Sequence, residues 1–202
     1  MTNFAGLLGC GLLCLALGAT VLRLNALPVR FRCVLVAATL LAVLVPIGEL
    51  SIAGYVRGAT GDLSAPTLAL AASAVLARLT GRTLFERWEV IALLCVVAGA
   101  ALFLYPFALG WTPFDPYALG YGSIAFISAL LLVTLVAWRM GFMLVVLVVL
   151  AGALACLGGL YESRNLWDYL VDPLAAGYAV AVLLWTRARR LVSQRRQRAP
   201  VV

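Results

Sequence analysis

The sequence predicts an all-α fold, a polytopic integral membrane bundle of about seven transmembrane helices. Three observations predict it: 65% of the 202 residues are hydrophobic, only 11% are charged, and the apolar residues form seven runs separated by short polar connections. A soluble domain carries roughly 25% charged residues, and a soluble helical core holds one or two such runs rather than seven. We expect a single transmembrane domain over residues 1–186 and a basic cytoplasmic tail over residues 187–202.

The first three runs differ in how well they fit a membrane span. Residues 4–22 have no basic residue before them, which favours a transmembrane helix over a signal peptide. The second run, 33–55, contains Pro46, which is expected to kink a continuous helix. Glu49 follows inside the same run and is expected to face protein or water, because a carboxylate is costly in hydrocarbon. The third run, 65–79, reaches roughly 22 Å, which is short of a hydrocarbon core of about 30 Å.

Four further runs complete the predicted bundle. They are residues 90–110, 119–138, 141–160 and 174–185. The fifth and sixth runs are joined only by Arg139 and Met140, so we expect them to form a tight antiparallel helix pair. The seventh run leads directly into the basic tail.

Residues 161–173 form the most polar stretch between two apolar runs. They contain three carboxylates, an arginine, an asparagine, a tryptophan and two tyrosines. In a helix, Asn165, Asp168 and Asp172 lie on one face, three or four residues apart. This spacing is typical of a short amphipathic helix lying in the membrane interface. We therefore expect such a helix near residues 162–171, with Asp172 as the N-cap of the last span.

The arginines predict the orientation of the bundle. With seven spans, every arginine except Arg57 and Arg164 falls on the side of the carboxyl terminus, and six of the eight acids fall on the opposite side. The inner arginines before the tail are Arg23, Arg30, Arg32, Arg78, Arg82, Arg87 and Arg139. The positive-inside rule then predicts an outer amino terminus and a cytoplasmic carboxyl terminus. The arginine-only, alanine- and leucine-rich composition favours a bacterial protein, and hence the inner membrane.

The absence of two residue types excludes several classes of chemistry. The chain contains no histidine, and all 15 of its basic residues are arginines. Without histidine, bis-histidine haem, most zinc and copper sites and a Ser-His-Asp mechanism are disfavoured. Without lysine, a Schiff base to retinal or pyridoxal phosphate is excluded. We therefore expect no cofactor.

Polar residues on the predicted outer side form the candidate site. They are Glu49, Arg57, Asp62, Glu162, Arg164, Asn165, Trp167 and Asp168. An ion pair of Glu49 with Arg57 or Arg164 is expected, either functional or simply stabilising. The same groups also fit a phosphate site, in which an arginine clamps the phosphate and carboxylates act as a base or bind Mg²⁺. No metal is assigned to them, and no nucleotide-binding loop or serine nucleophile motif is present.

Three functions fit this sequence. We expect a non-catalytic integral membrane subunit, or partner protein, of a larger membrane or envelope complex, because the chain is small, has short loops and lacks catalytic motifs. The alternatives are an outer-leaflet enzyme acting on a lipid-linked or phosphorylated substrate, and a small transporter using Glu49. Expected partners are the lipid bilayer and other membrane protein chains. The tail follows a membrane helix directly, so anionic lipid is a better partner for it than nucleic acid.

Overall fold

The computed structural model describes residues 4–22, 24–110 and 113–198. Arg23, Trp111 and the last four residues of the predicted tail lie outside the described residues. Within the described part, the chain forms nine α-helices, two 3-10 helices and one two-stranded hairpin. The predicted all-α helical bundle is therefore confirmed.

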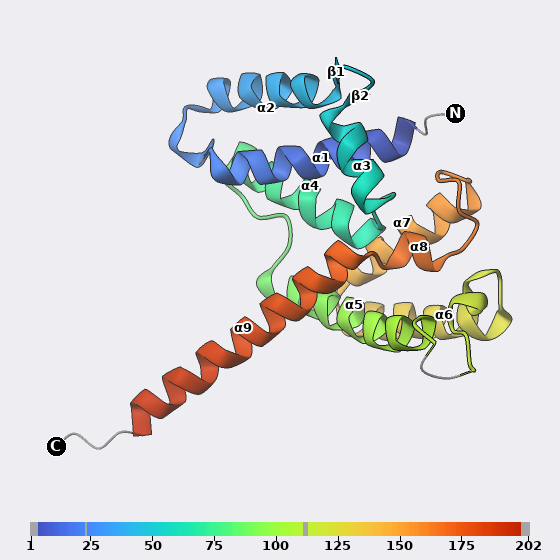
Figure 1. Ribbon diagram of the computed structural model, residues 1–202. Helices are drawn as coiled ribbons and strands as arrows, with labels where there is room; N and C mark the ends of the chain where they lie inside the picture. The colour runs from blue at the N-terminus through green and yellow to red at the C-terminus, as the bar shows by residue number, and fades with distance from the viewer. Residues whose placement is uncertain (1–3, 23, 111–112, 199–202) are drawn as a thin grey trace.

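The N-terminal half is built around its first helix. Its elements are α1 (Phe4–Val21), a 3-10 helix (Leu24–Ala26), α2 (Val29–Leu44), β1 (Pro46–Ile47), β2 (Leu50–Ser51), α3 (Ile52–Thr60) and α4 (Ala65–Thr80). Helix α1 packs against α2, α3 and α4 and lies between α2 and α4 in Figure 1. Glycines on α1, among them Gly6, Gly9 and Gly11, are buried and allow these neighbours to approach closely.

The second apolar run does not form the continuous helix that the sequence predicts. Helix α2 ends at Leu44, because Pro46 has no N–H and restricts Val45 to an extended conformation with φ −67° and ψ 130°. The chain then turns through Gly48, which has φ 81°, into the antiparallel hairpin β1–β2. Glu49 is therefore exposed at the tip of this hairpin instead of lying inside a span.

The C-terminal half supplies the larger part of the core. Its elements are α5 (Arg87–Ala108), a 3-10 helix (Tyr117–Gly120), α6 (Ile124–Arg139), α7 (Met143–Leu157), α8 (Trp167–Leu170) and α9 (Pro173–Arg198). Helix α5 packs against α7 and α9, whereas α6 packs mainly against α7. The buried cluster joins Leu93 of α5, Val145 of α7 and Ala179 of α9. Helix α9 then extends beyond the bundle, so the predicted tail is helical as far as Arg198 (Figure 1).

The predicted interfacial helix near residues 162–171 is wrong except for its last turn. Only α8 is helical, and residues 158–172, which we call the strap, otherwise form an irregular loop. The Asn165 N–H donates to Ser163 Oγ at 3.0 Å, and the Trp167 N–H donates to Asn165 Oδ1 at 3.0 Å. These side chains accept hydrogen bonds from backbone N–H groups that would otherwise bond within a helix, so the loop is stable without helical hydrogen bonds there.

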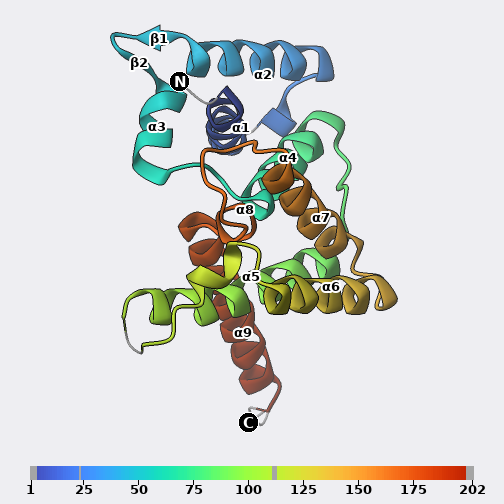
Figure 2. The ribbon, with the colours of Figure 1, turned by 90° about the vertical axis from the view of Figure 1, so that its right-hand side faces the viewer.

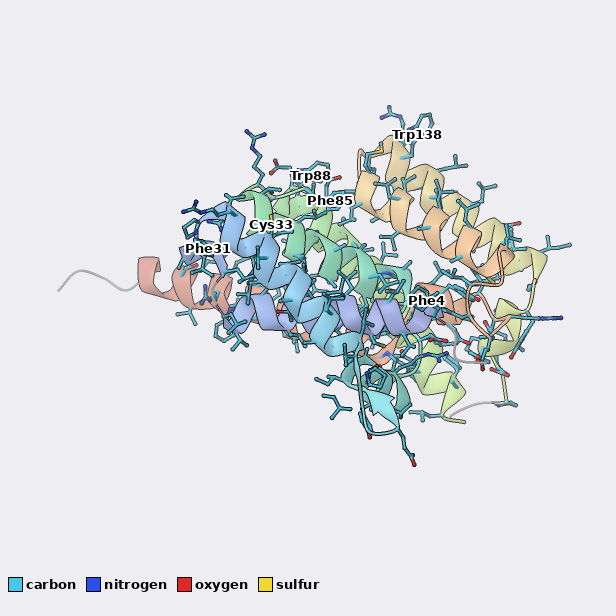
Figure 3. The ribbon with its side chains drawn as sticks, turned by 90° about the horizontal axis from the view of Figure 1, so that it is seen from above. Phe4, Phe31, Cys33, Phe85, Trp88 and Trp138 are labelled. Atoms are coloured by element: carbon cyan, nitrogen blue, oxygen red, sulfur yellow. The ribbon has the colours of Figure 1, made fainter. Side chains whose placement is uncertain are left out.

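Seven helices run from one end of the bundle to the other in alternating directions: α1, α2, α4, α5, α6, α7 and α9 (Figure 1). Figure 3 shows this for the first two, with Phe4 and Phe31, near the starts of α1 and α2, at opposite ends. One end, the arginine end, gathers the α1–α2, α4–α5 and α6–α7 connections. There the Arg32 guanidinium donates to the Arg78 carbonyl at 3.0 Å, and the ring centroids of Trp88 and Phe142 lie 5.3 Å apart.

The other end, the polar end, holds the hairpin, the α5–α6 connection and the strap. Figure 2 looks onto this end and shows the strap between the two halves of the chain. Among the described helices, α1 and α5 are long and apolar enough to cross a membrane, and three further apolar helices are shorter. The number of membrane spans therefore stays a prediction.

Candidate functional site

The structure places all eight predicted site residues at the polar end but does not bring them into one site. Three of them line a pocket of about 450 Å³ beside the hairpin: Glu49, Arg57 and Asp62. Three others lie in the strap and bond to the α5–α6 connection or to the strap itself: Asn165, Trp167 and Asp168. The remaining two, Glu162 and Arg164, have exposed side chains on the strap.

Arg57 forms an ion pair with Asp62 rather than with Glu49. Its Nε donates to Asp62 Oδ1 at 2.6 Å, and its Nη2 donates to Asp62 Oδ2 at 3.2 Å. Both side chains are 19% exposed. The hydrogen bond with Asp62 raises the pKa of Arg57, and the charge of Glu162 contributes in the same direction. Arg57 therefore does not form the expected pair with Glu49, and the Nε–Nη2 edge of its guanidinium, which could bind a phosphate with two N–H groups, is already used by Asp62.

Local backbone features position this ion pair. Helix α3 ends at Thr60, and the next residue, Gly61, has φ 74° and lets the chain turn so that Asp62 folds back toward Arg57. Gly6 of α1 lies directly against the pair. A Cβ at this position would overlap Asp62 Oδ1 and lie 2.5 Å from Arg57 Nε. Sequence reasoning missed Gly6, because its partners are more than 50 residues away.

The strap is tied to the α5–α6 connection by side-chain bonds. Asn165 is fully buried, and its Nδ2 donates to the Tyr117 carbonyl at 2.9 Å. The Trp167 Nε1 donates to the Pro116 carbonyl at 2.9 Å, and its ring centroid lies 4.4 Å from that of Phe126. These contacts make Asn165 and Trp167 structural residues of the bundle end.

Asp168 takes part in the same attachment. Its Oδ2 accepts hydrogen bonds from the Tyr117 hydroxyl at 2.9 Å and from Ser163 Oγ at 2.5 Å. Burial, followed by the bond to Asp168, raises the pKa of Tyr117, so this hydroxyl stays protonated and donating at neutral pH. The carboxylate is thus engaged by two donors, which leaves it poorly placed to act as a general base.

Tyr161 ties the strap to the link between α3 and α4. Its hydroxyl donates to the Leu63 carbonyl at 2.7 Å, and its own N–H donates to the Tyr169 hydroxyl at 3.0 Å. The two tyrosine rings stack with centroids 4.9 Å apart. Burial raises the pKa of Tyr161 to about 12. A buried, protonated donor of this kind holds two segments nearly 100 residues apart.

Asp172 is the most strongly engaged carboxylate of the polar end. It is 4% exposed, and its Oδ2 accepts from the Ser64 N–H at 2.8 Å, from Ser64 Oγ at 2.6 Å and from Thr67 Oγ1 at 2.6 Å. Its Oδ1 accepts from the Ala175 N–H at 2.7 Å, which confirms the predicted N-cap of the last helix. Its second role, at the start of α4, was not predicted, because Ser64 and Thr67 lie more than 100 residues earlier in the chain.

Most polar side chains of these clusters already form hydrogen bonds within the chain, which limits the chemistry they can perform. Within the described residues, no group of three or more His, Cys, Asp or Glu side chains is placed to hold a metal ion. Comparisons of the chain with family models, with curated proteins and with solved structures give no match. A function for this chain therefore has to be inferred from its own geometry.

Proposed function

We propose that this chain is a non-catalytic integral membrane subunit, or partner protein, of a larger membrane or envelope complex. The observation that carries this proposal is the engagement of the polar residues at the polar end. Arg57, Asp62, Asn165 and Asp168 are bonded to other groups of the same chain. Asn165 and Asp168 join the strap to the α5–α6 connection, and Arg57 and Asp62 form the ion pair at the end of α3. Few polar groups of the predicted site are therefore free for catalysis.

Exposed apolar surface supports a membrane location. Ile124 of α6 is 82% exposed, and Leu132 and Trp138 on the same helix are also exposed. Contiguous apolar surface of this kind is rare in water and is typical of a membrane or protein interface. Lipid and partner helices would cover it. We therefore expect a bacterial inner-membrane protein with multiple spans.

The distribution of charge supports seven spans with the amino terminus outside. Among the described connections, the arginine end carries six arginines and two glutamates, a net charge of +4. The polar end carries two arginines and six acids. The positive-inside rule assigns the arginine end to the cytoplasm. A 16-residue helix reaches about 24 Å, so the shorter helices need flanking residues such as snorkelling arginines to bridge about 30 Å.

The end of α9 supports contact with anionic lipid. The Arg189 guanidinium lies 4.8 Å from the centroid of the Trp185 ring, where the apolar part of the helix gives way to arginines. Tryptophan and arginine are typical of the membrane interface. A helical basic segment leaving the bilayer there would be attracted to acidic headgroups of the inner leaflet.

An outer-leaflet enzyme is the second candidate, and one observation favours it. Glu49, Arg57 and Asp62 line the same pocket of about 450 Å³, which is within the usual size of small-molecule sites. A phosphorylated substrate would have to displace Asp62 from Arg57, and that makes this candidate weaker. A transporter using Glu49 loses its main support, because Glu49 is exposed at the hairpin tip.

Affinity purification tests the proposal. The tagged full-length chain is extracted from native membranes in mild detergent, and stoichiometric partner proteins are identified by mass spectrometry. We expect a partner that co-purifies with the wild-type chain and with both Glu49→Gln and Arg139→Gln, a matched change at the opposite end. A chain that purifies alone, together with a cellular phenotype for Glu49→Gln but not for Arg139→Gln, would favour the enzyme instead.

A further inference from the structure

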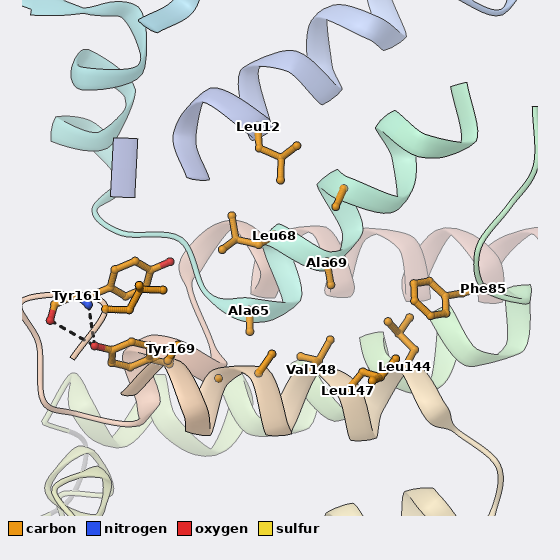
Figure 4. A pocket seen from close by; sticks show the side chains of 15 residues that line it. Leu12, Ala65, Leu68, Ala69, Phe85, Leu144, Leu147, Val148, Tyr161 and Tyr169 are labelled. Carbon is orange, nitrogen blue, oxygen red and sulfur yellow. Dashed lines mark hydrogen bonds between the residues drawn. The ribbon is translucent and has the colours of Figure 1, made fainter. Parts of the chain in front are cut away.

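A second cavity lies between the two halves of the chain. It has a volume of about 420 Å³, is lined by residues of α1, α4 and α7 and is open on one side, where Leu147 and Ala151 are exposed (Figure 4). Alanines line it from two sides: Ala65, Ala69 and Ala72 from α4, and Ala151 and Ala155 from α7. Leu12 of α1 lies over it. We call this cavity the α4–α7 groove.

The polar end of the groove is closed and offers no free polar group. The stacked rings of Tyr161 and Tyr169 form this end (Figure 4). The hydroxyl of Tyr161 is used by the Leu63 carbonyl, and that of Tyr169 donates to the Ser163 carbonyl at 2.9 Å. All other lining side chains are apolar. The occupant of this groove must therefore be hydrocarbon.

The width of the groove decides between a helix and a single chain. Its lining residues on α7 extend from Leu144 to Ala155, eleven residues apart, which is about 17 Å along a helix. Dividing 420 Å³, the volume open to the centre of a water-sized sphere, by this length gives a mean area of about 25 Å². By the same measure, with about 1.4 Å taken off its radius, a helix about 10 Å in diameter needs about 40 Å². A helix is therefore too wide to lie inside the groove, whereas an extended hydrocarbon chain can lie in it.

The opposite end of the groove lies at the arginine end of the bundle. Phe85, from the α4–α5 connection, marks this mouth (Figure 4). Arg82, Glu86 and Arg87 lie within three residues of Phe85 and are exposed, so two positive charges and one negative charge flank this mouth. Together with the net charge of +4 of the arginine end, this positive excess favours an acidic headgroup over a neutral one.

We propose that the α4–α7 groove binds one acyl chain of an anionic phospholipid, with its phosphate at Arg82 and Arg87. The inference rests on the membrane location proposed above. The lipid would enter from the inner leaflet and lie along α4 and α7, with its methyl end against the tyrosine pair. It would fill the space where the two halves meet, so the bundle would carry it as a structural component.

Intact-protein mass spectrometry tests the apolar part of the proposal. The purified, delipidated full-length chain is exchanged into vesicles of phosphatidylglycerol or of phosphatidylcholine, re-extracted and weighed. We expect one retained phosphatidylglycerol per chain, and at least tenfold lower occupancy for Ala151→Phe, which fills the groove. Ala37→Phe, on an exposed face of α2 outside the groove, should retain the lipid. Equal occupancy in these two variants would overturn the proposal.

Ala72→Leu fills the groove from α4 and gives an independent result if Ala151→Phe does not fold. For the mouth, a chain with both Arg82→Gln and Arg87→Gln should lose its preference for phosphatidylglycerol, whereas Arg30→Gln at the same end should keep it. An unchanged preference in the double variant would overturn the headgroup assignment.

A photoreactive side chain placed at Ala151 identifies the occupant directly in native membranes. We expect a phospholipid adduct; an adduct with another protein or with a second copy would overturn the lipid assignment. If the chain is in the membrane with its protein partner but holds no lipid, this inference fails alone. If the chain is not in the membrane, the proposed function fails with it.

Discussion

Asp172 accepts a 2.6 Å hydrogen bond from the hydroxyl of Ser64, a residue 108 positions earlier in the chain. The same carboxylate accepts the backbone N–H groups of Ser64 and of Ala175, so it serves the start of α4 and the start of α9 together. A negative charge is favourable at the N-terminus of a helix. One buried acid thus joins the two halves of the bundle at the polar end.

Asp172→Ala should destabilise the chain more than any change to an exposed acid. It leaves the Ser64 and Thr67 donors buried without their acceptor, and each hydrogen bond to a charged group contributes about 1.5–3 kcal/mol. We expect a loss of about 3 kcal/mol or more, seen as a melting temperature lower by about 6–12 °C in detergent. Asp115→Ala, at an exposed position, is the control. Equal melting temperatures for the two variants would contradict the bridging role.

Gly6→Ala tests the contact of α1 with the ion pair at the end of α3. The added methyl group would force Arg57 and Asp62 apart, and overpacking of this kind costs about 1–3 kcal/mol. Gly99→Ala is the matched control, because a Cβ there meets no atom within 4 Å, and alanine is favoured in a helix by up to about 1 kcal/mol. In thermal unfolding, Gly6→Ala should therefore lower the melting temperature, whereas Gly99→Ala should leave it unchanged or raise it. A neutral Gly6→Ala would show that the ion pair does not depend on α1.

Trp167→Ala should loosen a segment that is distant in sequence. It removes both the bond to the Pro116 carbonyl and the packing against Phe126. Truncation of a buried tryptophan costs about 3–5 kcal/mol, and hydrogen exchange should rise in residues 117–121. Trp167→Phe keeps most of the packing and loses only the bond, so about 1–2 kcal/mol is expected. Unchanged exchange at 117–121 in both variants would show that the strap does not hold this connection.

Tyr161 predicts a loss of stability at high pH. Burial raises its pKa to about 12 in the folded chain, against about 10 when unfolded. Since the folded state favours the protonated hydroxyl, this contribution to stability is fully present below about pH 10 and declines between about pH 10 and 12. Tyr161→Phe should show a shallower decline over this range in denaturant titrations. An identical pH profile in the variant would mean that the hydroxyl does not titrate with unfolding.

The helices were predictable where their end signals are local. Ser64 followed by Pro66, and Asp172 followed by Pro173, each mark a helix start that the structure contains. The apolar runs also predicted the seven helices that pass from end to end. The effect of Pro46 was not predictable, because a proline that kinks a helix and a proline that ends one look alike in sequence. Here the helix ends before Pro46, and Gly48, with a positive φ, lets the chain turn into the hairpin.

The arrangement of the polar residues was not predictable from local spacing. The pattern around Asn165 and Asp168 fits a helix, but their partners at Tyr117 lie about 50 residues away and stabilise a loop instead. Likewise, Gly6 packs directly against the ion pair of Arg57 and Asp62, but a glycine within an apolar run gives no indication of a polar neighbour. These contacts depend on how the helices pack, and helix periodicity carries no information about that.

A seven-span bundle places its polar end outside the cytoplasm. Single cysteines introduced into a cysteine-free chain test this arrangement, using a membrane-impermeant maleimide on intact cells. Glu162→Cys should be labelled from outside, whereas Arg30→Cys, Arg82→Cys and Arg139→Cys should react only after the membrane is permeabilised. Labelling of Arg30→Cys and Arg82→Cys from opposite sides would contradict seven spans, because either α2 or α4 would then not cross the membrane.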